Sequence, residues 1–357
     1  MKVAFVVPYP KGIAPSQRFR FEQQLDFLEN EKISYTFYPF LSVNAFEVLY
    51  KPKRYFTKFY FTLLGFLKRF FLMFQLRNYN FVFIHREASP IGPPVFEFII
   101  SKILKKKIIY DFDDAIWMVN TSTVNKIVAG VKYHHKVASI CNWAYKVSCG
   151  NEYLASYASS FNKNVAVIPT TVDTEKVHNK KKIQKTKKIV LGWTGTHSTI
   201  KYLFDFETFL VKMQERYQFR FIVISNKEPQ FKTLKYDYLA WNKESEIEDL
   251  LRINVGIMPL ILDKWAKGKC GFKAIQYMAL GIPAVVSKVG VNEKIVSDSV
   301  NGFVCSSEKD WENAFEKLLT NENLREEFGQ KAQEKIERNY STSSQQNNYL
   351  RLFDFPS

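Results

Sequence analysis

The hydrophobic and polar positions of the chain predict strands that alternate with helices. Apolar residues at helical spacing predict helices over Ser16–Asn30 and Pro94–Leu104. Short runs rich in β-branched or aromatic residues predict buried strands at Val3–Val7, Ser34–Tyr38, Phe81–His85, Lys107–Phe112, Val147–Cys149 and Val165–Ile168. Strands that alternate with helices form βαβ units, so we expect a parallel sheet with helices on both faces.

The same pattern restarts after a lysine-rich polar stretch, residues 176–188, which we interpret as a linker. The strands and helices expected beyond it are Ile189–Trp193, Phe219–Ser225, Glu244–Leu251, Val255–Met258, Phe272–Leu280, Ala284–Ser287, Trp311–Asn321 and Leu324–Asn339. The sequence therefore predicts an α/β protein with two doubly wound domains, residues 1–175 and 189–335, that face a central cleft. Ligands of such sheets bind beyond the carboxyl ends of the strands.

Composition narrows the class, and charge points to a partner. Of the 357 residues, 46% are hydrophobic and 24% charged, which excludes a wholly disordered, collagen-like or coiled-coil chain. Residues 1–187 contain 28 Lys and Arg against 13 Asp and Glu, whereas the remainder contains 23 against 22. The positive excess therefore belongs to the first half. It predicts an anionic partner there: a phosphorylated lipid surface, a nucleic acid or an anionic small molecule.

Residues 50–77 interleave basic residues with many aromatic residues and leucines. Lys and Arg can extend to lipid headgroups while aromatic side chains enter the headgroup layer, so this segment predicts membrane contact. The alternative is a core helix whose apolar face packs on the sheet, and both can hold for different faces. The longest uncharged run, Phe59–Leu67, is shorter than the roughly 20 residues that span a bilayer, so no span is expected.

Two further patterns favour a cytosolic protein. The apolar run Val3–Val7 breaks at Pro8 and lacks a small-residue cleavage pattern, so we expect a buried strand rather than a signal peptide. The four cysteines form no C-x-x-C pair and are too few for a disulfide framework in a chain of this length. Reduced thiols are the simplest interpretation.

Lys269 and Lys273 flank a turn that leads into a predicted helix. Helix N-termini carry unsatisfied N–H groups and the positive end of the helix dipole, so two lysines there suit a pyrophosphate. Gln276 lies on the same helical face and can hydrogen-bond hydroxyl groups. The alternative is that both lysines are solvated surface residues.

A second phosphate candidate is the turn Gly192–Ser198, which follows a predicted strand. Gly195 and Thr196 in this turn allow backbone N–H groups to approach a phosphate closely. Lys201, just inside the following helix, is a further candidate contact. His197 is interpreted as an exposed loop histidine.

Polar residues also follow two strands of the first domain. The cluster Asp111–Asp114 ends a buried strand, and its carboxylates suit a metal site or an acid–base pair. The alternative is capping of a helix over Ala115–Val119. Arg86 follows the neighbouring strand and suits an acceptor phosphate, or alternatively a pair with Glu87.

Taken in order, these motifs resemble glycosyltransferase family 4, a group with the GT-B fold. The motif K-x-x-[E/Q]-Y-M-A-x-G-x-P-x-V is carried by Lys273, Gln276, Tyr277, Met278, Ala279, Gly281, Pro283 and Val285. Asn301–Phe303 matches the family's N-G-F turn, and Ile168–Asp173 resembles its I-P-x-x-V-D motif. Gly192–Gly195 resembles the glycine-bearing turn that opens the donor domain. The resemblance covers nearly the whole chain, and the order and spacing of the motifs make it specific.

The resemblance implies a retaining transferase with two Rossmann-like domains, which moves a hexosyl unit from a nucleotide diphosphate sugar. It implies that a last helix, 336–357, crosses back to the first domain. It also implies donor and acceptor contacts. The donor contacts are Gly195, Thr196, Lys201, Lys269, Lys273 and Gln276, and the acceptor contacts are Gly12, Arg18, Arg20 and Arg86. Asp113 takes the place where the family often carries a histidine at the reaction centre, so it is our catalytic candidate. No metal or other cofactor is expected, because in this family helix dipoles and basic side chains neutralise the leaving diphosphate.

The sequence departs from the family at Gln276, where Glu is usual, and at Gly268–Cys270, where a carboxylate near the sugar is missing. Trp193 replaces a usual arginine. The alternatives considered are therefore an inactive homologue that serves as a membrane-bound scaffold, a GT-B epimerase, and a nucleic-acid binder, although no nucleic-acid motif is present. We prefer the transferase, with a lipid-linked or surface glycan as acceptor at the inner face of the cell membrane. The basic first half suits a phosphorylated lipid.

Overall fold

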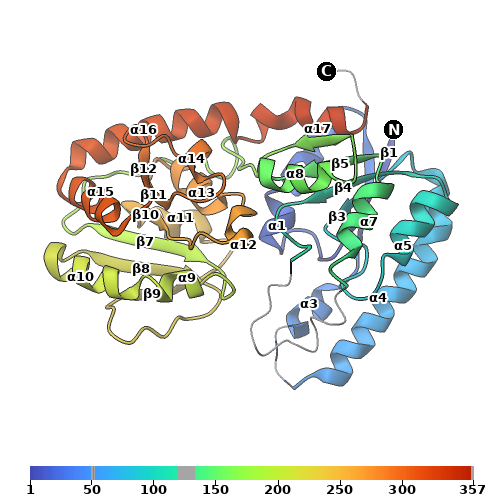
Figure 1. Ribbon diagram of the computed structural model, residues 1–357, viewed down its shortest axis with the longest axis horizontal. Helices are drawn as coiled ribbons and strands as arrows, with labels where there is room; N and C mark the ends of the chain where they lie inside the picture. Colours follow the sequence, from blue (N-terminus) through green and yellow to red (C-terminus); the bar gives the residue numbers. More distant parts are fainter. Residues whose placement is uncertain (50, 52, 119–132, 355–357) are drawn as a thin grey trace. The chain divides into compact units, whose positions relative to one another are not determined.

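The computed structural model of the chain describes residues 1–49, 51, 53–118 and 133–354. The chain divides into two compact units (Figure 1). The first contains Met1–Thr170 and the segment that begins at Gln345, and the second contains Thr171–Ser344. Each unit holds a six-stranded parallel sheet with helices, which confirms the predicted α/β class.

The sheet of the first unit has the strand order β2-β1-β3-β4-β5-β6. Its strands are β1 (Lys2–Val7), β2 (Ser34–Pro39), β3 (Phe81–His85), β4 (Lys107–Phe112), β5 (Lys146–Cys149) and β6 (Val165–Val167). All neighbouring strands are parallel. Because the order reverses at β1, the carboxyl ends of β1, β3 and β4 form the edge where such sheets bind ligands.

The core of the first unit includes a segment from late in the chain. Val3 and Phe5 of β1 belong to the same buried cluster as Tyr349, Leu350 and Leu352 of α17 (Gln346–Leu352). The expected crossing helix, 336–357, is therefore divided between the units. Residues from 345 on pack in the first unit, whereas the preceding helix α16 (Glu322–Asn339) lies in the second.

Two helices predicted in the first unit are interrupted. Residues 16–30 form α1 (Pro15–Arg18), a 3-10 turn η1 (Glu22–Gln24) and α2 (Leu25–Asn30). The prediction of one continuous helix was wrong because Phe19 and Phe21 are both buried, and residues two apart do not share a helix face. Residues 94–104 form α5 (Val95–Phe98) and a π-helical turn, η3 (Ile99–Ile103). The remaining helical segments are α3 (Val43–Leu49), η2 (Leu76–Asn78), α7 (Lys136–Trp143) and α8 (Glu152–Ser159).

The longest helix of the first unit is α4 (Tyr55–Gln75), which Figure 1 shows beside α5. One face of α4 is buried on the unit, while Phe56 is 93% exposed on the other. By length and composition, Tyr55–Asn78 is apolar enough to cross a membrane, with a mean hydropathy of 1.3 and 28% of the tested window buried. The expectation based on Phe59–Leu67 was too narrow, because the helix continues beyond that uncharged run.

The sheet of the second unit has the order β12-β11-β10-β7-β8-β9. Its strands are β7 (Val190–Gly195), β8 (Arg220–Ser225), β9 (Asp237–Ala240), β10 (Val255–Met258), β11 (Ala284–Ser287) and β12 (Gly302–Cys305). The sequence analysis missed β9 and β12, which are the two edge strands. β9 has only partly buried residues and β12 begins with glycine, so neither shows the apolar run of a central strand.

The helices of the second unit are α9 (Lys201–Phe204), α10 (Glu207–Tyr217), α11 (Glu246–Leu250), α12 (Lys264–Lys267), α13 (Phe272–Ala279), α14 (Asn292–Ile295), α15 (Glu308–Thr320) and α16. The stretch 176–188, predicted as a linker, belongs to this unit. Lys182 donates its backbone N–H to the Leu280 carbonyl at 2.8 Å, and Gln184 exchanges hydrogen bonds with Asn254.

Candidate active site

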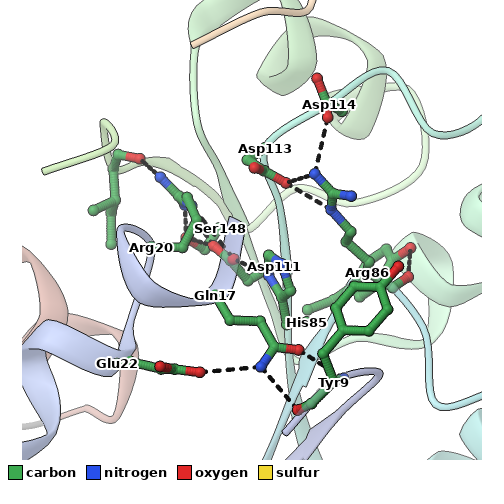
Figure 2. A network of polar contacts seen from close by, with 12 residues as sticks. Tyr9, Gln17, Arg20, Glu22, His85, Arg86, Asp111, Asp113, Asp114 and Ser148 are labelled. Carbon is green, nitrogen blue, oxygen red and sulfur yellow. Dashed lines mark hydrogen bonds and ion pairs between the residues drawn. The ribbon is translucent and has the colours of Figure 1, made fainter. Parts of the chain in front are cut away.

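A buried polar network stands at the carboxyl ends of β3 and β4 in the first unit (Figure 2). The Asp111 carboxylate accepts from His85 Nδ1 at 2.8 Å and from the Ser148 hydroxyl at 2.8 Å. Its other partner is the Arg20 guanidinium, at 2.5 Å. Arg20 also donates to the Ile168 carbonyl and to Ser148.

The electrostatics of this network favour a charged Asp111. Burial opposes the carboxylate, but attraction to Arg20 and the His85 hydrogen bond outweigh it and hold the Asp111 pKa below its usual range. Arg20 is 1% exposed. Its guanidinium therefore fixes β4 to β5 and to Ile168, in place of the acceptor contact that the resemblance implied.

Arg86 lies in a second, less buried cluster beside the first (Figure 2). Its Nε donates to Asp113 at 2.8 Å, and its Nη2 lies 2.8 Å from Asp114. Burial disfavours the guanidinium charge, but the two carboxylates outweigh it and raise the Arg86 pKa. Arg86 has φ +59, a backbone strain often found at functional sites. The alternative pair with Glu87 does not form, since Glu87 binds Lys136 at 2.7 Å.

The catalytic candidate Asp113 thus pairs directly with the acceptor candidate Arg86. The two Asp113 and Asp114 carboxylates do not cap a helix in the described residues 115–118, which form turns. Val119, the last residue of that alternative, lies outside the described residues. The side chains of Arg86, Asp113 and Asp114 keep 22%, 14% and 19% exposure, so an oxygen-rich ligand can reach this cluster.

The loop after β1 is held by side chains of α1 and η1. Gly12 donates its N–H to Glu22 Oε2 at 2.7 Å and has φ +83, which favours glycine. Gln17 bridges Glu22 Oε1 and the backbone of Tyr9. Burial raises the Glu22 pKa, and its hydrogen bonds only partly offset this. Gly12 therefore shapes a loop at the sheet edge. The last acceptor candidate, Arg18, is 8% exposed with its guanidinium over the Phe19 ring at 4.8 Å.

In the second unit, the turn after β7 places the first group of donor candidates. A Cβ at Gly195 would lie 2.4 Å from the Trp193 ring, so only glycine fits there. The Thr196 hydroxyl contacts Ser198 at 2.8 Å, and its carbonyl accepts from the Thr199 N–H. Lys201 is exposed at the start of α9. His197 is exposed, as expected, and contacts Asn226.

The second group of donor candidates surrounds the start of α13. Lys273 Nζ lies 5.4 Å from the centroid of the Trp193 ring, and Lys269 Nζ lies 5.2 Å from the Trp265 ring. Both lysines are partly buried rather than fully solvated, contrary to the surface-lysine alternative. The Thr194 N–H donates to the Tyr277 hydroxyl at 2.8 Å. The structure thus brings the β7 turn and the α13 motif into contact.

Sequence reasoning missed one carboxylate of this site. Gln276 is buried, and its Nε2 lies 3.4 Å from Glu246 Oε1, which also accepts from Trp241 Nε1 at 3.0 Å. A carboxylate therefore stands beside Gln276 although the motif itself lacks one. The acidic first turn predicted for 244–251 was the available signal, but sequence spacing did not connect it with Gln276.

Comparisons with known proteins place the chain. Residues 173–335 match the family model of group 1 glycosyl transferases. A sucrose-phosphate synthase from Thermosynechococcus elongatus has a similar structure, with a TM-score of 0.70, 11% identity, and 99% of this chain and 98% of that chain covered. For a glycosyltransferase from Rickettsia africae these values are 0.67, 11%, 99% and 97%. For Anabaena HepE in complex with UDP and glucose they are 0.63, 13%, 99% and 99%. No curated protein sequence matches the chain.

The family match and the two-sheet fold define the class of protein, a glycosyltransferase with the GT-B fold. The second unit carries the group 1 glycosyl transferase domain, which includes the β7 turn, Lys269, Lys273 and Gln276. The resemblance inferred from the motifs is thereby confirmed. The low identities to solved structures support the fold and leave the choice of substrates to the site itself.

Proposed function

We propose that this chain transfers a hexosyl unit from a nucleotide diphosphate sugar to a glycan, with retention of anomeric configuration. The contact between the β7 turn and the α13 motif carries the proposal. It sets Lys273 at the first turn of a helix, next to a Gly-Thr turn, inside the group 1 domain. A helix N-terminus with a lysine stabilises the charge of a diphosphate, which is the leaving group. HepE was solved with UDP-glucose, which favours a uridine nucleotide as the first to test.

The first unit supplies the acceptor side of the proposal. Arg86, Asp113 and Asp114 lie at the carboxyl edge of its sheet, where Arg86 can bind an acceptor phosphate and Asp113 can contact the reacting hydroxyl. We propose a lipid-linked or surface glycan as acceptor, within polysaccharide biosynthesis, because this half of the chain carries the positive excess. The protein would then be cytoplasmic and peripheral on the inner face of the cell membrane. It would need no bound metal, since Lys269, Lys273 and the helix dipole offset the diphosphate charge.

A thermal-shift titration with UDP, GDP, ADP and their sugars tests the donor site. One nucleotide at about 100 times its Kd stabilises the native state by about 2.7 kcal/mol, which raises Tm by roughly 5–10 °C for a unit of this size. Lys273→Ala should abolish the shift. The matched control is Lys267→Ala, an exposed lysine of α12, which should keep it.

Turnover separates the transferase from the inactive homologue. With the nucleotide sugar that binds, we expect nucleotide release that persists in EDTA and a product whose anomeric configuration NMR shows to be retained. Nucleotide binding without turnover on any glycan acceptor would favour the scaffold alternative. An absence of shift with every nucleotide would refute the donor-site assignment.

A further inference from the structure

One side of α4 carries a continuous apolar surface that the first unit does not cover. Its residues are 46% to 93% exposed and recur every three or four positions, so they share one side of the helix. We call this set the α4 face: Phe56, Phe59, Tyr60, Leu63, Leu67, Phe70, Phe71 and Phe74. Exposed apolar patches of this kind mark interaction sites rather than ordinary surface.

The opposite side of α4 is fixed to the first unit. Arg69 is 1% exposed and donates to the Ala88 carbonyl at 2.7 Å and to the Val7 carbonyl at 2.8 Å. Gly65 lies against the Phe40 ring. Although α4 is long enough to span a bilayer, a spanning orientation would take Arg69 away from both carbonyls into hydrocarbon. The contacts therefore suit a helix that lies in the membrane plane.

Charge around α4 selects the kind of surface. The sequence has no Asp or Glu between Glu47 and Glu87. Within this stretch Lys53 and Arg54 are exposed just before the helix, and Lys68 is exposed beside the α4 face. Basic residues that flank an aromatic, apolar face complement an anionic lipid surface.

An apolar groove adjoins the α4 face. Its volume is about 340 Å³, and its lining residues are Phe66, Ile91, Gly92, Pro93, Val95 and Phe96. Phe66 stands one helical turn before Phe70 of the α4 face, so the two surfaces adjoin along the helix. A Cβ at Gly92 would meet nothing within 4 Å, which leaves the groove open at that point.

We propose that the α4 face and this groove form one docking surface for an anionic phospholipid bilayer. In this arrangement α4 lies in the membrane plane with its face among the acyl chains, its basic neighbours contact the headgroups, and one lipid hydrocarbon chain enters the groove. The inference rests on the membrane association within the proposed function and names the residues and the orientation that produce it.

Vesicle sedimentation tests the α4 face. Vesicles of phosphatidylcholine with about 30% phosphatidylglycerol should bind the full chain, and about 0.5 M NaCl or phosphatidylcholine alone should weaken binding. Phe56→Gln/Phe59→Gln should weaken binding at least about ten-fold, since two aromatic side chains leave the lipid. The matched control, Phe161→Gln/Phe204→Gln, removes two exposed phenylalanines outside the surface and should bind like the wild type.

Photo-crosslinking tests the groove and the orientation. Phosphatidylglycerol with a diazirine in its acyl chain should label residues 91–96 and the α4 face, and Val95→Trp, which fills the groove, should reduce labelling of 91–96 only. Equal binding by the two double variants would overturn the proposal. So would labelling absent from both surfaces, or a concentration-dependent dimer that disappears in Phe56→Gln/Phe59→Gln. Nucleotide thermal shifts on the same proteins report separately on the proposed function, because no variant changes a donor-site residue.

Discussion

Asp111→Asn is the substitution whose cost follows most directly from the structure. It removes a buried negative charge and leaves the Arg20 guanidinium, which is 1% exposed, without its anion. Removal of one partner from a buried ion pair costs about 3–5 kcal/mol. For a unit of this size that corresponds to roughly 6–20 °C in Tm. We expect the loss to fall on the first unit, because Arg20, His85 and Ser148 all belong to it.

The pH dependence gives a second, independent signature. The folded Asp111 pKa is held below its unfolded value, so its stabilisation is complete above the unfolded pKa of about 3.9 and is lost as pH falls through the folded pKa. The free-energy gap between wild type and Asp111→Asn should therefore be constant from about pH 5 to 8. It should narrow below about pH 4.

Native-state hydrogen exchange in low denaturant is the appropriate assay, because amides of β3 and β4 report the first unit and amides of β7 and β8 report the second. Asp113→Asn is the control. Its partner Arg86 keeps Asp114 and partial exposure, so the loss should be about 1 kcal/mol or less. A loss below about 1 kcal/mol for Asp111→Asn, or an equal loss in both units, would refute the reasoning. Arg20→Met/Asp111→Leu should be more stable than Asp111→Asn, because no buried charge remains.

Two further substitutions test contacts elsewhere. Tyr277→Phe removes the acceptor of the Thr194 N–H and should cost about 1–3 kcal/mol in denaturant unfolding of the second unit, with weaker nucleotide binding because the β7 turn loosens; unchanged stability and affinity would contradict this. Gly65→Ala places a Cβ 2.5 Å from the buried Phe40 ring and should destabilise the first unit by about 1–3 kcal/mol despite the better helix propensity of alanine; a gain in Tm would show that Phe40 can move.

The central strands were predictable because their signal is local. Phe81–His85, Lys107–Phe112 and Val255–Met258 are buried along their length, and their apolar runs gave the observed boundaries. Edge strands such as Asp237–Ala240 lack that run, because one side faces solvent. The interrupted helix at 16–30 depends on which neighbours bury Phe19 and Phe21, and helical spacing alone does not contain that information.

The candidate site divides in the same way. Motif spacing identified Lys273 and Gln276, since both lie on one short helix. It did not identify Glu246 beside Gln276, because that contact joins residues 30 apart through the packing of α11 and α13. Arg20 was assigned to the acceptor from its position after a turn. Its partner Asp111 lies 91 residues away, so only the folded sheet shows that the charge is used internally.

The return of α17 to the first unit makes that unit discontinuous in sequence. Tyr349, Leu350 and Leu352 fill a core built around β1, so the earliest strand waits for residues made after the whole second unit. During synthesis the usual order, in which the amino-terminal domain folds first, is therefore disfavoured. The second unit, Thr171–Ser344, can complete its own sheet earlier. A nascent chain halted shortly after Ser344 would carry a folded sugar-nucleotide unit behind an unfinished, basic first unit whose apolar core is still open to chaperones.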